Sequence, residues 1–295
     1  ALGEDEYQEA VNGAQKVVVG EGITKIGTAL FMDFDLVSVS LSSTVEEIGK
    51  DAFRNTILNE INLENVKVIG DYAFYNTYIH TADLSSVQTI GKYAFSKTKI
   101  EKLVANNCET IGAYAFANCP LLEYVETTAK TINRYAFSKD AKISVLKLSD
   151  IVTLEQGAFF FCEGIRSVYL PKSIETIVNN AFCGCRALQS VKIEDGADVF
   201  IFEDAFASCE NLTLMYIPAS VTEFDEGCMF DSQGIKNVYI ITPVGSRAEQ
   251  YAKDYEINYT NNTGSVTVTF DAGEGRCEKA SATYTVGDSY GELPN

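Results

Sequence analysis

The apolar residues of this chain recur in one short block, Ile-Gly-x-x-Ala-Phe, which appears in full four times and in variant form elsewhere. The block and its variants occupy residues 26–31, 48–53, 69–74, 90–95, 111–116, 132–137, 154–159, 177–182, 201–206 and, in a degenerate copy ending at Met229, 224–229. The phenylalanine position advances by 21–24 residues at each step. A repeat of this period indicates a protein built from stacked copies of one structural unit.

A second apolar pattern follows each block and predicts a short strand. Three residues after the phenylalanine comes a small or thiol side chain, and then apolar-x-x-apolar-x-apolar, as in Leu188-x-x-Val191-x-Ile193. The last three positions alternate with period two, which is typical of a half-buried strand. A unit of about 21 residues cannot bury its own apolar stripe, so neighbouring units must cover one another. The pattern predicts a leucine-rich-repeat solenoid that is right-handed and mostly β and irregular, with short helical turns and one short parallel strand per repeat.

The glycine of the block predicts a particular backbone conformation. It follows the isoleucine directly, and a left-handed turn there would cost glycine nothing. Asn133 replaces this glycine in one copy, and asparagine also tolerates the left-handed region. Glu155, Val178 and Phe202 occupy the position in later copies, so the turn is expected to change in the second half.

The repeats also set the expected organisation of the chain. We expect an N-terminal cap at residues 1–12, the solenoid at 13–242, a helical cap at 243–260, and a linker with a partial small β module at 261–295. Caps are required because both ends of a solenoid expose its core. The helical cap is predicted from the spacing of Ala248, Tyr251, Ala252 and Tyr255.

The repeated unit resembles the BspA-like leucine-rich repeats of bacterial surface proteins. The shared unit is Ile-Gly-x-x-Ala-Phe-x-x-Cys-x-x-Leu-x-x-Val-x-Leu-Pro, and the chain carries it from about Gly13 to Thr242. Met229 replaces the phenylalanine in the last copy, and Asp140 replaces the cysteine in another. The resemblance implies an exported protein at the cell surface, in a family implicated in adhesion and in binding extracellular matrix proteins.

The tail Val266–Pro294 resembles the first part of a Listeria–Bacteroides repeat. It shares Val-Thr-Phe-Asp-Ala, the pair Gly273 and Gly275, and the ending Gly291-x-Leu293-Pro294. This resemblance implies a longer protein with several modules. The chain begins without methionine or a signal-peptide pattern, so we expect either that a signal peptide has been removed or that the sequence is a trimmed piece of a longer one.

Composition narrows the classes of function. The formal net charge is −18, from 23 Lys plus Arg against 41 Asp plus Glu, and so acidic a chain does not favour nucleic-acid phosphates. No apolar run is long enough for a membrane helix. The single histidine, His80, is expected at the surface of the sheet, and with no Gly-rich phosphate loop we expect neither catalytic residues nor a cofactor.

The eight cysteines are expected to be mostly free thiols. Cys119, Cys162, Cys185 and Cys209 share one repeat position with threonines, and a free cysteine packs like a small hydrophobe. A disulfide framework is the alternative for an even count in a secreted protein. No Cys-x-x-Cys pair is present, so no metal site is expected.

Acidic loop residues cluster in one repeat. A solvated acidic rim is the favoured interpretation, and a calcium site with oxygen ligands is the alternative. The residues concerned are Glu194, Asp195, Asp198, Glu203 and Asp204.

The outward residues of the predicted strands are the candidate binding surface, because side chains alternate between the two faces of a strand. One residue per strand forms a column, consisting of Val18, Ser40, Asn62, Asp83, Val104, Glu126, Lys147, Tyr169, Lys192, Tyr216 and Tyr239. The later part of this column is aromatic and basic, and Arg166, Gln189 and Lys236 flank it. Tyrosine and arginine are enriched at interface hot spots. The candidate ligand-binding residues are Lys147, Arg166, Tyr169, Lys192, Tyr216, Lys236 and Tyr239. The alternative is that these Tyr and Lys residues stabilise the sheet by cross-strand contacts.

The favoured function is a non-enzymatic surface or secreted protein whose sheet presents binding residues to a host protein, a glycan or a partner cell. A passive stalk that spaces another module from the cell wall is the main alternative. A glycan-processing enzyme with paired carboxylates is a remote third possibility. The expected partners are therefore extracellular proteins or glycans.

Overall fold

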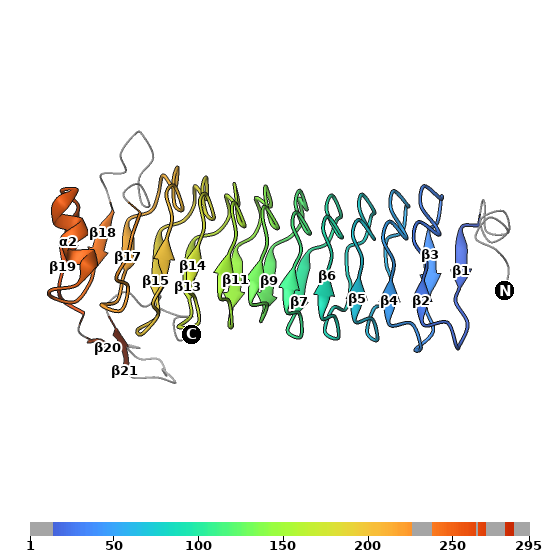
Figure 1. The fold of residues 1–295 in the computed structure, drawn as a ribbon, viewed down its shortest axis with the longest axis horizontal. Helices are drawn as coiled ribbons and strands as arrows, with labels where there is room; N and C mark the ends of the chain where they lie inside the picture. The colour runs from blue at the N-terminus through green and yellow to red at the C-terminus, as the bar shows by residue number, and fades with distance from the viewer. Residues whose placement is uncertain (1–13, 226–237, 264, 270–280, 286–295) are drawn as a thin grey trace, which may run out of the picture.

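The chain forms an elongated solenoid (Figure 1), and the repeated phenylalanines form one column along its core. The computed structural model describes residues 14–225, 238–263, 265–269 and 281–285. From Phe31 to Phe206, successive rings stack with centroids 5.1–5.4 Å apart and interplanar angles of 1–21°. The predicted solenoid with a continuous core is therefore confirmed.

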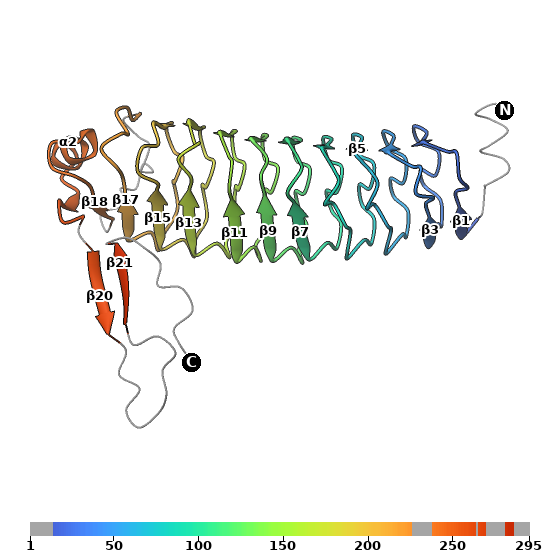
Figure 2. The ribbon, with the colours of Figure 1, turned by 90° about the horizontal axis from the view of Figure 1, so that it is seen from below.

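Parallel strands on one side of the solenoid correspond to the predicted strand pattern (Figure 2). They pair in three groups, β1–β3, β7–β9–β11 and β13–β15–β17–β18–β19. Their bounds are β1 Lys16–Val18, β3 Ser38–Ser40, β7 Lys102–Ala105, β9 Tyr124–Thr127, β11 Val145–Leu148, β13 Ser167–Leu170, β15 Ser190–Ile193, β17 Leu214–Tyr216, β18 Tyr239–Ile241 and β19 Asn258–Thr260. Between β3 and β7 the pairing is reduced to isolated bridges, from Ser38 to Glu60 and from Glu60 to Thr81.

A second parallel sheet runs along the solenoid and contains nine strands of two residues each. Each strand ends on the buried isoleucine or leucine of the repeated block. The strands are β2 Lys25–Ile26, β4 Glu47–Ile48, β5 Val68–Ile69, β6 Thr89–Ile90, β8 Thr110–Ile111, β10 Thr131–Ile132, β12 Thr153–Leu154, β14 Thr176–Ile177 and β16 Phe200–Ile201. Sequence alternation missed this sheet, because two residues are too few to show a period of two.

The expected left-handed turn at the block glycine is wrong. Gly49, Gly70, Gly91 and Gly112 are absent from the positive-φ positions, and the residue before the alanine is left-handed instead, as at Tyr93 with φ 55°. The glycines serve close packing between coils. A Cβ on Gly112 would lie 2.5 Å from the carbonyl carbon of Gly91, so the neighbouring backbone leaves no space for a side chain.

The small or thiol position forms a buried ladder beside the phenylalanines. Cys162 Sγ donates to the carbonyl of Phe137 at 3.0 Å, and the thiol of Cys185 donates to that of Phe159 at 3.3 Å. The structure records six free, buried cysteines in the described part of the chain: Cys108, Cys119, Cys162, Cys183, Cys185 and Cys209. Cys228 and Cys277 lie outside the described residues.

Asp140 interrupts this ladder with a buried carboxyl group. Its Oδ1 accepts from the backbone N–H of Cys119 at 2.6 Å, while Oδ2 is buried without a hydrogen-bond partner. Burial raises the pKa of Asp140 well above its ordinary value. The carboxyl group is therefore held in its neutral form over a wider pH range than an exposed aspartate.

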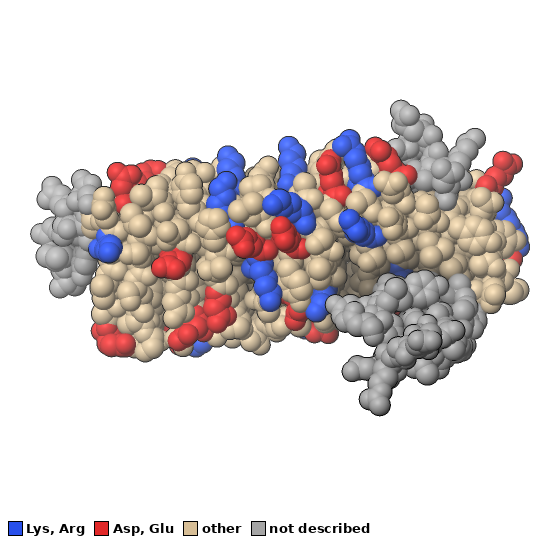
Figure 3. Space-filling view, turned by 180° about the vertical axis from the view of Figure 1, so that it is seen from behind, with Lys and Arg blue, Asp and Glu red and all other residues tan. Residues whose placement is uncertain are grey.

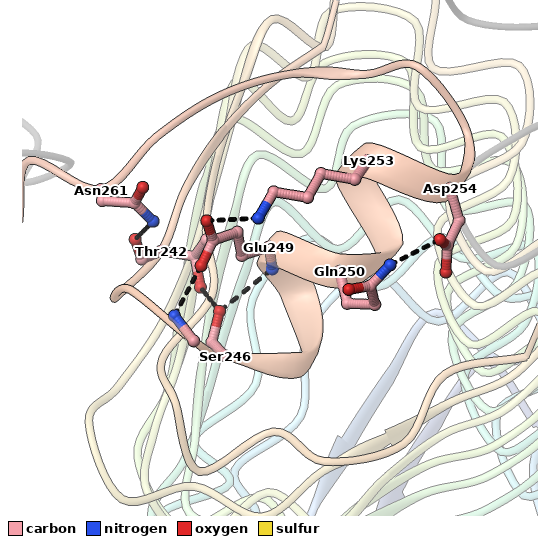
Figure 4. Close-up of polar contacts among 8 residues, drawn as sticks. Thr242, Ser246, Glu249, Gln250, Lys253, Asp254 and Asn261 are labelled. Carbon is pink, nitrogen blue, oxygen red and sulfur yellow. Dashed lines mark hydrogen bonds and ion pairs between the residues drawn. The ribbon is translucent and has the colours of Figure 1, made fainter.

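The C-terminal side of the solenoid ends in helix α2, Arg247–Asp254 (Figure 4). Ser246 caps the helix by accepting from the backbone N–H of Glu249 at 3.0 Å, and Glu249 accepts from the N–H of Gly245. Tyr251 is buried, with its ring centroid 5.3 Å from that of Phe224. The helix therefore packs against Phe224, which lies partly buried at the edge of the core, as expected of a cap.

Strands β20 Ser265–Thr269 and β21 Ser281–Thr285 pair antiparallel as a two-stranded sheet of their own. They lie in the region expected to hold a partial β module. The predicted N-terminal cap at residues 1–12 and the degenerate block around Met229 lie outside the described residues.

Candidate functional site

The candidate site is the sheet face, which we define as the outward surface of the strands from β1 to β19. Strand register aligns Val104, Glu126 and Lys147 in one row across β7, β9 and β11. In the next hydrogen-bonded group of strands, an equivalent row aligns Tyr169, Lys192 and Tyr216 across β13, β15 and β17. The expected column therefore exists across these six strands.

Three of the predicted binding residues are well exposed on adjacent strands. Lys147 lies on β11, Tyr169 on β13, and Arg166 immediately before β13. Tyr169 is 48% exposed, and Val145 on β11 is 39% exposed. Within the described part of the chain, the structure records no hydrogen bond or ion pair for the Arg166 guanidinium. An aromatic, an aliphatic and two cationic side chains thus face solvent together.

Tyr216 does not lie on the surface as expected. The residue is only 4% exposed, and its hydroxyl donates to Asp195 Oδ1 at 2.9 Å. Lys192 is half-buried, with its Nζ 5.5 Å from the centre of the Tyr216 ring. These contacts stabilise the sheet, which is the alternative role that the sequence left open for such residues.

Tyr239 lies one row away from the expected column. The register pairs Tyr216 with Ile241, whereas Tyr239 pairs with Leu214. Its side chain is still outward and 42% exposed. Lys236, the remaining candidate, lies outside the described residues.

Tyr124 joins the basic part of the sheet face, and the column prediction missed it. Its ring centre lies 4.8 Å from Lys102 Nζ and 5.3 Å from Lys147 Nζ, and its hydroxyl donates to Glu126. Lys147 is also 3.4 Å from Glu126 Oε2. The sequence could have identified this tyrosine, because Tyr124 lies two residues before Glu126 on the same strand and therefore on the same outward face.

The contacts among Tyr124, Glu126 and Lys147 shift the pKa values of the two charged side chains. Tyr124, followed by Asn106, lowers the pKa of Glu126 by hydrogen bonding to its carboxylate. Tyr124 and then Glu126 raise the pKa of Lys147. Figure 3 shows this side of the molecule, with charges of both signs interspersed over its middle. Opposite charges that neutralise one another give this part of the face little net attraction for a charged ligand.

The acidic loop residues are used in local contacts. Glu194 Oε2 accepts from the backbone N–H of Lys172 at 2.7 Å, and Asp198 Oδ1 lies 3.4 Å from the Thr222 hydroxyl. Among the described residues, no group of three or more His, Cys, Asp or Glu side chains is arranged to hold a metal ion. The same part of the chain contains no helix with the length and apolarity needed to cross a membrane.

The fold and the repeat define the class of the protein as a leucine-rich-repeat solenoid. A family model described as "BspA type Leucine rich repeat region" matches six copies over residues 3–129 and 130–253. The chain therefore belongs to the BspA-type leucine-rich-repeat family, and this resemblance is confirmed. This is a family of repeat proteins rather than of enzymes. The match ends at residue 253, so the resemblance of the tail to a Listeria–Bacteroides repeat stays a prediction.

Solved structures that match this chain include three bacterial proteins with 15–21% sequence identity. A leucine-rich cell surface protein of Faecalibacterium prausnitzii is 21% identical over 82% of this chain and 90% of that one, with a TM-score of 0.40. Pneumococcal vaccine antigen PcpA is 15% identical over 83% and 78%, with a TM-score of 0.43. A leucine-rich-repeat protein of T. pallidum is 16% identical over 84% and 91%, with a TM-score of 0.40. The search of curated proteins gives no match.

Proposed function

We propose that this chain is a non-enzymatic binding protein, exported to the cell surface or secreted, whose sheet face recognises an extracellular protein. The observation that carries this proposal is the exposed group on β11 and β13, formed by Val145, Lys147, Arg166 and Tyr169. We call these four residues the β11–β13 patch.

The chemistry of the patch favours a protein partner. Tyrosine offers a large rigid surface at a small entropic cost, and arginine adds directed hydrogen bonds, so both dominate interface energetics. Val145 on β11 adds exposed apolar area to the patch. The parallel strands hold all four side chains on a rigid surface, which limits the entropy lost on binding.

Exposure of the patch at a cell surface is supported by the family. BspA-type repeats resemble those of bacterial surface proteins, and the F. prausnitzii protein is named as a cell surface protein. At the contact itself, the exposed Arg166 guanidinium favours a partner with an acidic group, because like charges placed opposite each other weaken binding. We expect an extracellular matrix protein or another exposed protein as the partner.

A passive stalk is the second candidate, and the continuous phenylalanine ladder favours it. Eight successive ring contacts from Phe31 to Phe206 make the solenoid a stiff rod. A stalk requires length and stiffness but makes no demand on the sheet face. The two candidates therefore predict different results for substitutions in the β11–β13 patch: a binding protein should lose affinity for its partner, whereas a stalk should be unaffected.

The test is to probe the full chain against an array of extracellular matrix proteins and glycans. The double variant Arg166→Ala, Tyr169→Ser should lose at least about tenfold in affinity for the protein that binds. The control is Val18→Ser, which changes an 81% exposed residue in the same row at the far end of the face. Binding that both variants leave intact would remove the patch from consideration. A silent array would favour the stalk. Binding to glycans alone would reassign the partner class if the double variant weakens it.

A further inference from the structure

The sheet face is interrupted between β3 and β7, and two outward side chains account for the interruption. Asn62 Oδ1 accepts from the backbone N–H of Glu64, and Asp83 Oδ1 accepts from the N–H of Ser85, each at 2.9 Å. Such local turns compete with strand pairing for the backbone. The coils between β3 and β7 are consequently joined on this side only by isolated bridges.

A groove with a volume of about 450 Å³ lies at this interruption. Its lining includes Asn62, His80, Asp83, Glu101, Lys102 and Val104. Small-molecule sites in proteins have volumes of roughly 300–1,000 Å³, so the space suits a ligand of one or two sugar rings. The groove is separate from the β11–β13 patch and lies closer to the N-terminal end of the face.

The polar groups of the groove supply both donors and acceptors. The Asn62 Nδ2 amide group has no hydrogen-bond partner among the described residues and remains available as a donor. The Ser85 hydroxyl and then its backbone N–H lower the pKa of Asp83, so this carboxylate is ionised at neutral pH and accepts hydrogen bonds. His80 Nδ1 lies 3.3 Å from Glu101 Oε1, which orients both side chains at the rim.

The charges of the groove argue for a neutral ligand. Asp83 and Glu101 disfavour an anion, while Lys102 disfavours a cation. A sugar carries no charge, and each of its hydroxyl groups both donates and accepts, so it can use carboxylate, amide and ammonium groups at once. Val104 adds an apolar contact for the C–H surface of a ring.

We propose that this groove binds a neutral saccharide of one or two rings. Nothing in this inference depends on the protein partner of the β11–β13 patch, because the groove uses different coils and different side chains. The chain would then carry two separate recognition sites on one face.

The test measures binding of glucose, galactose, mannose, N-acetylglucosamine, lactose and cellobiose to the full chain by saturation-transfer NMR and calorimetry. We expect at least one of them to bind with millimolar affinity. Val104→Trp places an indole in the groove and should abolish this binding. The matched control is Val18→Trp, which makes the same change at the same strand position but outside the groove.

A second variant tests the polar contacts without changing the groove's shape. Asp83→Asn keeps the turn, since asparagine already makes it at position 62, but removes the charged acceptor and should weaken binding about tenfold. Arg166→Ala, Tyr169→Ser should leave sugar binding unchanged, which separates this inference from the proposed function. Absence of binding by all six sugars, or binding that Val104→Trp leaves intact, would overturn the proposal.

Discussion

The two halves of the solenoid stack the same phenylalanine ladder but solve the turn before it differently. In the first half, the left-handed residue before the alanine is a tyrosine in four successive coils, at positions 72, 93, 114 and 135. In the second half it is Gly157, Asn180 or Asp204, all of which tolerate positive φ better. A bulky residue in this conformation costs about 1–2 kcal/mol, so the first half carries strain at this turn that the second half avoids there, although Phe161 is left-handed at a different position of its coil.

Stacking of the tyrosine rings offsets this strain. Successive rings from Tyr72 to Tyr135 lie 4.6–5.2 Å apart with interplanar angles of 3–22°. The series stops at Gly157, where a Cβ would lie 2.3 Å from Cε1 of Tyr135. Because the rings stack face to face, their faces are covered and cannot serve as a platform for a ligand.

The hydrogen bonds of the small-residue ladder differ between threonine and cysteine rather than strictly between the halves, since Cys119 in the first half already donates to the carbonyl of Phe95 in the preceding coil. Thr56 and Thr77 donate to the phenylalanine carbonyl of their own coil, each at 3.0 Å. Cys162, Cys185 and Cys209 donate to the phenylalanine carbonyl of the preceding coil. The comparison teaches that the phenylalanine ladder fixes the fold, while the turn before it and the residue type in the small-residue ladder vary along the chain.

The largest effect is expected where the halves are alike. Phe116→Ala in the first half and Phe182→Ala in the second each remove a fully buried ring stacked on both sides. Each should lower the free energy of unfolding by about 3–5 kcal/mol, measured by urea unfolding with circular dichroism. Tyr78→Ala, at a 54% exposed position, is the control. A loss below about 1 kcal/mol in either half would contradict a shared core.

The second prediction concerns the glycine position of the repeated block, where the two halves should differ in how much stability a substitution costs. A Cβ on Gly91 would lie 2.6 Å from the backbone nitrogen of Asp71, so Gly91→Ala should cost about 1–3 kcal/mol. Glu155→Ala changes the corresponding position in the second half, where a side chain is already accommodated, and should stay within about 0.5 kcal/mol. Equal losses in the two variants would refute the role assigned to close coil packing.

The third prediction concerns Asp140, near the boundary between the halves. Asp140→Cys restores the ladder residue and removes a buried oxygen without a partner, but it also loses the bond from Cys119. We expect a net gain of about 1 kcal/mol in the free energy of unfolding at neutral pH.

The pH dependence of the stability gain is a more specific test of Asp140→Cys than its size at neutral pH. Above about pH 3.8 the unfolded chain releases the Asp140 proton, whereas the folded chain retains it because burial raises the pKa. The stability contributed by the neutral carboxyl is therefore complete below this pH and is lost as the pH rises through the folded-state pKa. The gain from Asp140→Cys should grow from pH 4 upward, and a gain that is constant with pH would contradict the raised pKa.

The smallest effect is expected in the tyrosine stack. Tyr93→Asn loses two stacked ring contacts, worth about 0.5–1.5 kcal/mol each, and a wider edge contact with Tyr75 at 6.3 Å, but it relieves left-handed strain of about 1–2 kcal/mol. The net change should stay within about 1 kcal/mol of the original chain by the same urea measurement. Tyr93→Phe, which keeps the ring, is the control. A loss comparable to that of Phe116→Ala would show that the stack is part of the core.

The repeat period and the alternation of apolar residues predicted the phenylalanine ladder, the parallel strands and the outward row from Val104 to Lys147. They did not predict which residue of the turn is left-handed, because a period shows which residues recur and not which dihedral each adopts. Burial of Tyr216 was also missed, since its partner Asp195 lies in a loop of the preceding coil. The groove was missed because Asn62 and Asp83 fit the column and interrupt the sheet only through local turns.

The uniform coil length of the first half has a consequence for the architecture of related chains. Removing residues 71–91 would join Gly70 to Lys92 and place Phe95 on Phe53, in the setting that Phe74 now occupies. Each column of repeated residues would remain continuous, and the solenoid would be one coil shorter. Gain or loss of a whole coil by unequal recombination would therefore change the reach of such a protein while leaving its interior chemistry intact.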